Sequence, residues 1–121
     1  MTSGDGFTIV HRDELERTGN WRLARRTLGV SSFGINMVEI PPGDAIPEHD
    51  EVDRDQEEVF CVLSGRATLI VDGTEHLAPE GTLARIDPPR RRTVRNDGDS
   101  PALVLIVSAP RSSGYEPMPW S

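Results

Sequence analysis

The chain lacks the features that mark several classes of protein. It has a single cysteine, Cys61, which excludes an internal disulfide and a cysteine-rich zinc site. No apolar run approaches the roughly 18 residues of a membrane span. Residues 1–15 contain neither the basic nor the apolar region of a secretory signal. We therefore expect a cytoplasmic protein without membrane contact.

Basic residues are also scarce. The 121 residues include 13 arginines, no lysine and 20 acidic residues, which gives a formal net charge of −7. The phosphate backbone of a nucleic acid would repel most of such a surface, so we expect no nucleic-acid partner. The one basic cluster is formed by the arginines of residues 90–95. Their simplest role is to form ion pairs with acidic neighbours.

Sustained helical periodicity is missing as well, and strand patterns take its place. One helical turn is expected at residues 13–17, and a short mixed strand at residues 21–28. Asp72-Gly73, between two strand-like runs, is a strong signal for a hairpin. Such closely spaced turns predict an antiparallel sandwich or barrel. The other expected strands span residues 7–10, 33–40, 58–63, 66–71, 74–77, 82–86, 91–95 and 102–108.

The segment 43–65 carries the candidate site. His49 and Glu51 are two positions apart, so on a strand both side chains point to one face. Glu58 begins the next strand, and an acidic loop can bring it close to the other two. An imidazole and two carboxylates suit a divalent transition metal such as Fe, Mn, Ni or Zn.

The spacing in this segment resembles the first motif of the cupin superfamily. Five residues separate Gly43 from His49, and six separate Glu58 from Gly65. Glu51 stands where cupins have a second histidine, and the loop after it is longer than in the motif. The second cupin motif matches at its two ends, Gly81 and Asn96. Between them, Arg92 replaces the histidine ligand, and Asp87 and Pro89 replace a proline and a glycine.

The resemblance implies an all-β fold, a single-domain cupin-like jelly-roll β-barrel with its pocket inside the barrel. Residues 1–20 would form an N-terminal arm, 21–110 the barrel and 111–121 a C-terminal tail. A homodimer is also implied, and the apolar strand positions Val59, Cys61 and Leu63 need cover from the opposite sheet or a partner. Many cupins bind a metal through three histidines and one glutamate. Their activities range from dioxygenases, isomerases and decarboxylases to non-catalytic sensors, so the fold alone does not choose a function.

Three functional alternatives follow from the position of Arg92. A guanidinium stays protonated and has no lone pair for a metal, so Arg92 cannot replace the histidine as a ligand. In the first, the pocket holds no full metal site, and Arg92 pairs with Glu58 or Glu51 or grips an anionic group. In the second, His49, Glu51 and Glu58 hold a divalent transition metal. In the third, Arg92 lies on the surface and there is no functional site.

We therefore expect a small protein that binds a small polar or anionic molecule inside the barrel. His49, Glu51, Glu58 and Arg92 would line the site. The alternative is a metal-dependent enzyme of the isomerase, cyclase or dioxygenase type, with His49, Glu51 and Glu58 as ligands. Catalysis without metal, with His49 and a carboxylate as acid and base, is a further hypothesis. His76, on a hairpin arm, is expected to be exposed, and Cys61 to be a small buried hydrophobe.

Overall fold

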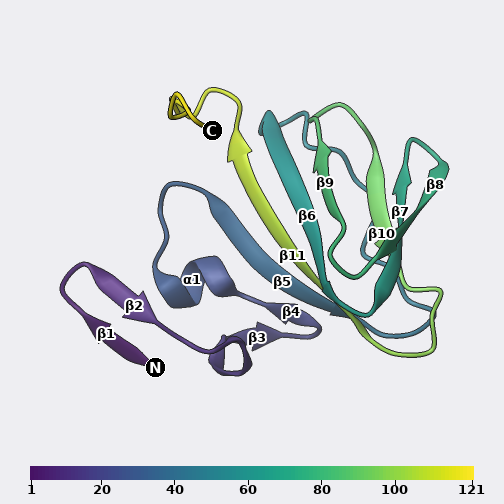
Figure 1. The fold of residues 1–121 in the computed structure, drawn as a ribbon, viewed down its shortest axis with the longest axis horizontal. Helices are drawn as coiled ribbons and strands as arrows, with labels where there is room; N and C mark the ends of the chain where they lie inside the picture. Colours follow the sequence, from purple (N-terminus) through teal and green to yellow (C-terminus); the bar gives the residue numbers. More distant parts are fainter.

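The computed structural model describes all residues, 1–121. It contains eleven strands, one short α-helix and one 3₁₀-helix (Figure 1). In chain order these are β1 (Thr2–Gly4), β2 (Phe7–Ile9), η1 (Arg12–Glu14), β3 (Arg17–Thr18), β4 (Trp21–Arg22), α1 (Ala24–Leu28), β5 (Gly34–Ile40), β6 (Gln56–Ser64), β7 (Arg66–Val71), β8 (Thr74–Pro79), β9 (Leu83–Ile86), β10 (Arg92–Arg95) and β11 (Ala102–Pro110). No helix is both long and apolar enough to cross a membrane.

Two sheets form the body of the molecule. The larger has six strands in the order β3-β4-β5-β11-β6-β9, and the smaller has the order β10-β7-β8. Bridges at Ala45–Arg95 and His49–Arg92 attach the segment after β5 to the smaller sheet. The strands β1 and β2 form a separate hairpin. The predicted all-β jelly-roll fold is confirmed, although the two sheets are not closed into a continuous hydrogen-bonded barrel.

Glycines set two of the turns between strands. In the predicted β7–β8 hairpin, Asp72 and Gly73 both have positive φ, 49° and 81°, as a two-residue turn of this kind requires. Gly65, between β6 and β7, has φ 74°, and a Cβ there would lie 2.6 Å from the carbonyl oxygen of Pro101. The turn at Gly65 therefore has room only for glycine.

The core fills the space between the sheets and follows the alternation of the strands. On β6, Phe60 and Val62 point inward and are buried, whereas Val59, Cys61 and Leu63 are half-buried on the outer face. Cys61 is thus less buried than expected, because the alternation of β6 places it outside the core. Thirteen buried apolar residues form one cluster, which contains Val38, Ile40, Ile46, Phe60, Val62, Ala67, Leu69, Ala78, Ile86, Val94, Ala102, Val104 and Ile106.

The N-terminal part corrects two sequence expectations. The expected strand 21–28 is a strand only at Trp21–Arg22, and α1 follows, ended by Gly29 in the left-handed conformation. The expected turn at 13–17 is instead the 3₁₀-helix Arg12–Glu14, because the ring of His11 accepts the backbone N–H of Asp13 and caps this turn. Side-chain capping and a left-handed glycine, rather than apolar periodicity, fix both elements.

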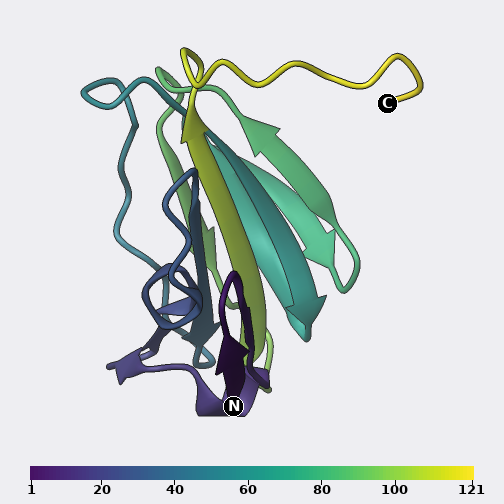
Figure 2. The same cartoon turned by 90° about the vertical axis from the view of Figure 1, so that its left-hand side faces the viewer.

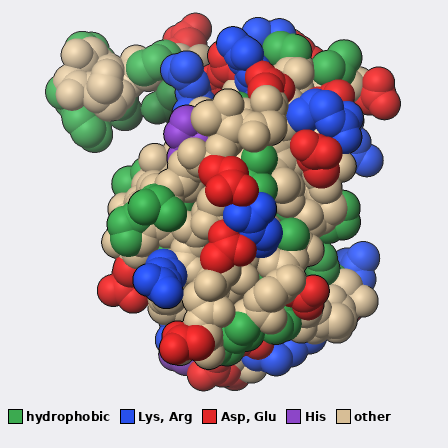
Figure 3. All heavy atoms as spheres, turned by 90° about the vertical axis from the view of Figure 1, so that its right-hand side faces the viewer, with side chains coloured by type: hydrophobic (Ala, Val, Ile, Leu, Met, Phe, Trp, Pro, Cys, Tyr) green, Lys and Arg blue, Asp and Glu red, His purple; other side chains and the backbone are tan.

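Charged side chains cover the outside of the smaller sheet. Arg95 pairs with Glu75 at 2.8 Å, and Arg90 pairs with Asp72 at 2.8 Å. Figure 3 shows acidic and arginine side chains intermingled over the side of the molecule that carries β7 and β8. The arginine cluster at 90–95 is thus largely neutralised by ion pairs. At the other end of the chain, residues 111–121 contain no strand and extend away from the sheets (Figure 2).

Candidate functional site

The inner face of the larger sheet is apolar at one end and polar at the other. Val104 on β11 lies between Val38 on β5 and Val62 on β6. Four residues further along β11, Ser108 lies between Gly34 and Glu58. The same alternation that buries the valines therefore directs Glu58 inward, where its side chain is only 8% exposed.

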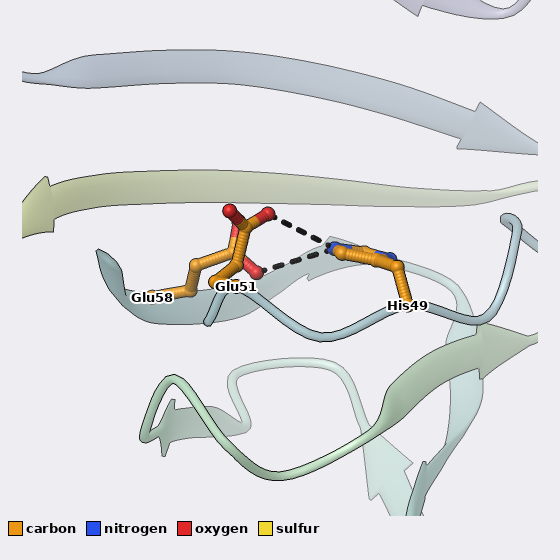
Figure 4. Close-up of side chains that lie close together, drawn as sticks. All are labelled: His49, Glu51 and Glu58. Atoms are coloured by element: carbon orange, nitrogen blue, oxygen red, sulfur yellow. Dashed lines mark ion pairs between the residues drawn. The ribbon is translucent and has the colours of Figure 1, made fainter. Parts of the chain in front are cut away.

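The segment after β5 brings two further side chains to Glu58. His49 exchanges two backbone hydrogen bonds with Arg92, of 3.0 and 2.8 Å, and the N–H of Glu51 donates to the carbonyl of Pro88 at 2.9 Å. Backbone pairing thus fixes both residues against the loop and strand that follow β9. Figure 4 shows the His49 and Glu51 side chains directed toward Glu58, as their spacing predicts.

The three side chains converge on the Nε2 atom of His49. This nitrogen lies 3.4 Å from Oε1 of Glu51 and 3.5 Å from Oε1 of Glu58 (Figure 4). The other ring nitrogen, Nδ1, lies 2.9 Å from the carbonyl oxygen of Pro47. A carbonyl only accepts hydrogen bonds, so Nδ1 carries a hydrogen. In the neutral ring, Nε2 would then present a lone pair to two carboxylates, and a bound cation would remove the repulsion.

Glu58 has an unusual electrostatic environment. Burial raises its pKa above the ordinary value, and the negative charge of Glu51 raises it further. The charges of Arg92 and His49 act in the opposite direction and only partly offset these effects. The Oε1 atom of Glu58 is buried and has no hydrogen-bond partner. A carboxylate with a raised pKa and an oxygen that accepts no hydrogen bond is suited to take up a proton or a cation.

Arg92 lies behind Glu58. Its side chain is fully buried, with Nη1 3.3 Å from Oε1 of Glu58 and Nη2 donating to the carbonyl of Asp87 at 2.6 Å. On β10, Arg92 and Val94 face inward, whereas Thr93 and Arg95 are only half-buried. The guanidinium is therefore inside the molecule, where it balances the charge of the buried carboxylate. It does not line the cavity in front of Glu58, so direct contact of Arg92 with a ligand stays a prediction.

A cavity of about 320 Å³ opens in front of the three converging side chains. Its ionisable wall residues are His49, Glu51 and Glu58, and no arginine lines it. The complete lining consists of Trp21, Gly34, Ile35, Asn36, Ile46, Pro47, His49, Glu51, Glu58, Ile106 and Ser108. Apolar walls with a few convergent polar groups are typical of sites for small molecules.

A comparison with protein families matches residues 36–108 to the family model described as Cupin domain. This match covers more than half of the chain and contains all four of the predicted site residues. The chain belongs to the cupin family.

Solved structures share the fold of this cupin. A cupin protein from Bacteroides fragilis has a TM-score of 0.79 at 20% identity, and the match covers 95% of this chain and 93% of that one. A sugar phosphate isomerase from a cupin superfamily of Silicibacter pomeroyi has a TM-score of 0.72 at 23% identity, with coverage of 84% and 75%. A predicted oxalate decarboxylase from Thermotoga maritima has a TM-score of 0.71 at 17% identity, with coverage of 84% and 98%. At these identities the likeness shows the fold alone.

The donor set of this cupin fits a divalent metal ion at three positions. His49, Glu51 and Glu58 each offer one ligand atom, and the three atoms lie within 4.8 Å of one another. The hydrogen bond from Nδ1 to Pro47 orients the ring and leaves Nε2 free for a metal, the usual arrangement of a metal-bound histidine. Arg92, at the fourth family position, supplies no ligand atom. A metal held by these residues would keep coordination positions open to water or substrate.

The sequence patterns predict only part of the cavity wall. Trp21 and Ser108 both line the wall and were not predicted. Ser108 could have been found, because strict alternation along β11 places it on the same face as Val104 and Ile106. Trp21 lies on a strand of two residues, too short for a periodicity signal. His76 is exposed on β8 and far from the site along the sheet order, as expected.

Proposed function

We propose that this cupin binds a small polar molecule in the cavity between the sheets, through His49, Glu51 and Glu58. The observation that supports the proposal is the convergence of the imidazole Nε2 and two carboxylates on the wall of a cavity of about 320 Å³. Hydroxyl and amine groups donate to the carboxylates, and a protonated imidazole donates to a carbonyl or hydroxyl oxygen. Trp21, Ile46 and Ile106 contribute an apolar part of the wall, against which the carbon skeleton of such a molecule can pack.

The same group can move a proton. With Nδ1 bound to Pro47, the proton of the imidazolium that is free to leave is the one on Nε2, between the two carboxylates. Glu58, whose pKa is raised by burial and by Glu51, accepts a proton more readily than an exposed glutamate does. An acid and a base on one wall are what an isomerase or cyclase needs. Acid–base chemistry on the bound molecule is therefore consistent with the site.

A metal centre on the same three residues is the second candidate function. The lone pair of a neutral His49, directed at two carboxylate oxygens, supports it, because a divalent cation would be attracted by all three groups. A bound metal would polarise a carbonyl or hydroxyl oxygen of the ligand. Glu51 and Glu58 would supply oxygen ligands and His49 the nitrogen ligand. The buried guanidinium of Arg92, 3.3 Å from Glu58, would partly offset the negative charge of that carboxylate.

Amide chemical-shift mapping tests the first candidate. Neutral polyols and hydroxy acids are titrated into ¹⁵N-labelled protein, and we expect shifts grouped at the cavity, including Asn36 and Ser108. His49→Ala and Glu51→Gln remove these shifts, whereas the matched variant His76→Ala, which changes an exposed histidine outside the cavity, preserves them. Shifts that persist in His49→Ala, or the absence of cavity shifts with every probe, would contradict the proposal.

Metal content separates the two candidates. The protein is purified without chelator, its bound transition metals are measured by mass spectrometry, and Mn²⁺ binding is followed by electron paramagnetic resonance. Stoichiometric metal in the wild type that is lost in His49→Ala and retained in His76→Ala supports the metal centre. Failure of the wild type to bind Mn²⁺, Fe²⁺, Ni²⁺ or Zn²⁺ would remove the second candidate and leave the first.

A further inference from the structure

A second hollow adjoins the cavity. Its volume is about 420 Å³, and it shares Gly34, Asn36 and Ser108 with the cavity wall. Two arginines, Arg25 and Arg54, stand on its wall, and no acidic residue does. The hollow and the cavity are therefore adjacent, with carboxylates on the wall of the cavity, the inner end, and guanidinium groups on the wall of the hollow, the outer end.

The two outer arginines have no carboxylate partner. Eight of the other arginines form ion pairs, which accounts for most of the basic residues in this acidic chain. Arg54 forms no side-chain hydrogen bond, and Arg25 donates only to the carbonyl of Val30, at 3.1 Å. Asp55, the acidic neighbour of Arg54, is engaged by Arg111 at 2.7 Å. Both guanidinium groups thus remain available to a ligand.

The other polar groups of the hollow suit an oxyanion. The hydroxyls of Ser31 and Ser32 and the side-chain amide of Gln56 line it together with the two arginines. Hydroxyl and amide N–H groups donate hydrogen bonds, and a guanidinium offers a planar pair of donors that matches a carboxylate or phosphate. With no acidic residue on this wall, nothing in the hollow repels an anion.

Gly34 is one of the three residues that line both the hollow and the cavity. Gly34 on β5 lies opposite Ser108 on β11, and a Cβ at Gly34 would lie only 2.5 Å from the Ser108 hydroxyl. The residue at this shared position therefore adds no atoms beyond the backbone. Because the cavity and the hollow share this wall, a ligand that occupied both would lie between the carboxylates at the inner end and the arginines at the outer end.

We propose that Arg25 and Arg54 form an anion subsite for the carboxylate or phosphate of the ligand whose polar end occupies the cavity. This assignment of a ligand class rests on the proposed function of the cavity. Glu51 and Glu58 repel an anion at the inner end, and the two guanidinium groups attract it at the outer end. The charge distribution thus admits the ligand in one orientation, with its hydroxyl or carbonyl group toward His49.

Inorganic phosphate, titrated by calorimetry at an ionic strength of about 0.1 M, tests the subsite by itself. The affinity of Arg25→Gln/Arg54→Gln for phosphate should be lower than that of the wild type by about tenfold or more, because two charge-assisted contacts are lost. The matched control is Arg12→Gln/Arg17→Gln, which removes the same charge from two exposed arginines outside the hollow that also lack ion pairs. We expect the control to stay within about twofold of the wild type, since distant exposed charges are screened.

Three outcomes would overturn the subsite. These are no phosphate binding by the wild type, equal weakening in the two double variants, and unchanged affinity in Arg25→Gln/Arg54→Gln. Circular dichroism confirms that each variant is folded, and the two single variants replace the double one if it is not.

His49→Ala separates this proposal from that of the cavity. The variant leaves both arginines in place, so phosphate binding persists in it even if the cavity binds no polar group. A second comparison tests the link between the two sites. A hydroxy acid that binds more tightly than the neutral polyol of equal carbon number should lose that advantage in Arg25→Gln/Arg54→Gln. An advantage that survives in this variant would contradict the shared ligand while leaving the phosphate result unaffected.

Discussion

Arg92 lies directly behind Glu58, with Nη1 3.3 Å from Oε1 and its own side chain fully buried. A permanent positive charge therefore occupies the position at which the second cupin motif has a histidine. It stabilises the ionised form of a carboxylate that burial and Glu51 disfavour. The electrostatics of the site consequently depend on a residue that does not line the cavity.

Removal of this buried cation is expected to destabilise the fold. Arg92→Met leaves Glu58 without its charge partner, and loss of one member of a buried pair typically costs about 3–5 kcal/mol. Urea denaturation measures the change in the free energy of unfolding. In Glu58→Gln/Arg92→Met the orphaned charge is gone, so this double variant should be clearly more stable than Arg92→Met. Equal stability of the two variants would contradict a charge-balancing role for Arg92.

The pH dependence of Glu58 follows from its raised pKa. The folded protein holds the Glu58 proton at pH values at which the unfolded chain, with its ordinary value of 4.5, has released it. The stability contributed by this proton is present at low pH and is lost as the pH rises from 4.5 through the raised pKa. In Glu51→Gln the pKa of Glu58 should fall, because a neighbouring negative charge is removed. Carbon-13 NMR of the side-chain carboxyl gives both midpoints, and a wild-type midpoint below 4.5 would refute this account.

Asn96 fixes the end of β10 from inside the protein. Its side chain is fully buried, donates to the carbonyls of Ile40 and Ser100 at 2.8 and 2.7 Å, and accepts the N–H of Gly98 at 2.9 Å. Asn96→Ala leaves these backbone groups without partners and should cost about 2–4 kcal/mol. Asn20→Ala, at an exposed asparagine, is the control and should change thermal unfolding by less than about 0.5 kcal/mol. Similar losses in the two variants would argue against a structural role for Asn96.

Two glycines with positive φ should differ in their tolerance of alanine. Gly73→Ala introduces only left-handed strain, about 1–2 kcal/mol, because nothing lies within 4 Å of the added Cβ. Gly65→Ala adds a contact of 2.6 Å with the carbonyl of Pro101, so we expect it to cost about 1–3 kcal/mol more. Chemical denaturation of the two variants gives the difference, and a smaller effect at Gly65 would mean that the turn relaxes.

The homodimer implied by the cupin resemblance stays a prediction. The outer face of β6 carries the half-buried apolar residues Val59, Cys61 and Leu63, which a second copy could cover. Light scattering of the purified chain should give twice the mass of one copy. The mass of a single copy at micromolar concentration would contradict the prediction.

The cytoplasmic location also stays a prediction and is checked by cell fractionation.

The local elements of the fold could be predicted from the sequence to different degrees. The Asp72-Gly73 hairpin and the apolar strand at 102–108 were predicted because their signals are local, namely a turn dipeptide and an unbroken run of strand-forming residues. Residues 21–28 were misread as a strand. This segment has no regular apolar spacing, and its short helix depends on the left-handed Gly29 and on packing of Ala24.

The sequence alone identified the main chemical groups of the site, namely the imidazole of His49 and the carboxylates of Glu51 and Glu58. The resemblance of the residues from Gly43 to Gly65 to the first cupin motif predicted the fold family, and such a motif can be recognised because its turns and strand phases are encoded over short distances. Alternation along β10 puts Arg92 and Asn96 on one face and Arg91 and Arg95 on the other, so only one of these two pairs can lie inside. Only tertiary packing decided between these two sets, since burial depends on the opposite sheet.

Only the folded chain showed that Arg92 is shielded from the cavity and that Arg25 and Arg54 share a hollow beside it. These arginines lie on a helix and a loop that are distant in sequence, and no local pattern links them. Charges that attract or repel a ligand act through space, so their combined effect is fixed by three-dimensional proximity rather than by spacing along the chain.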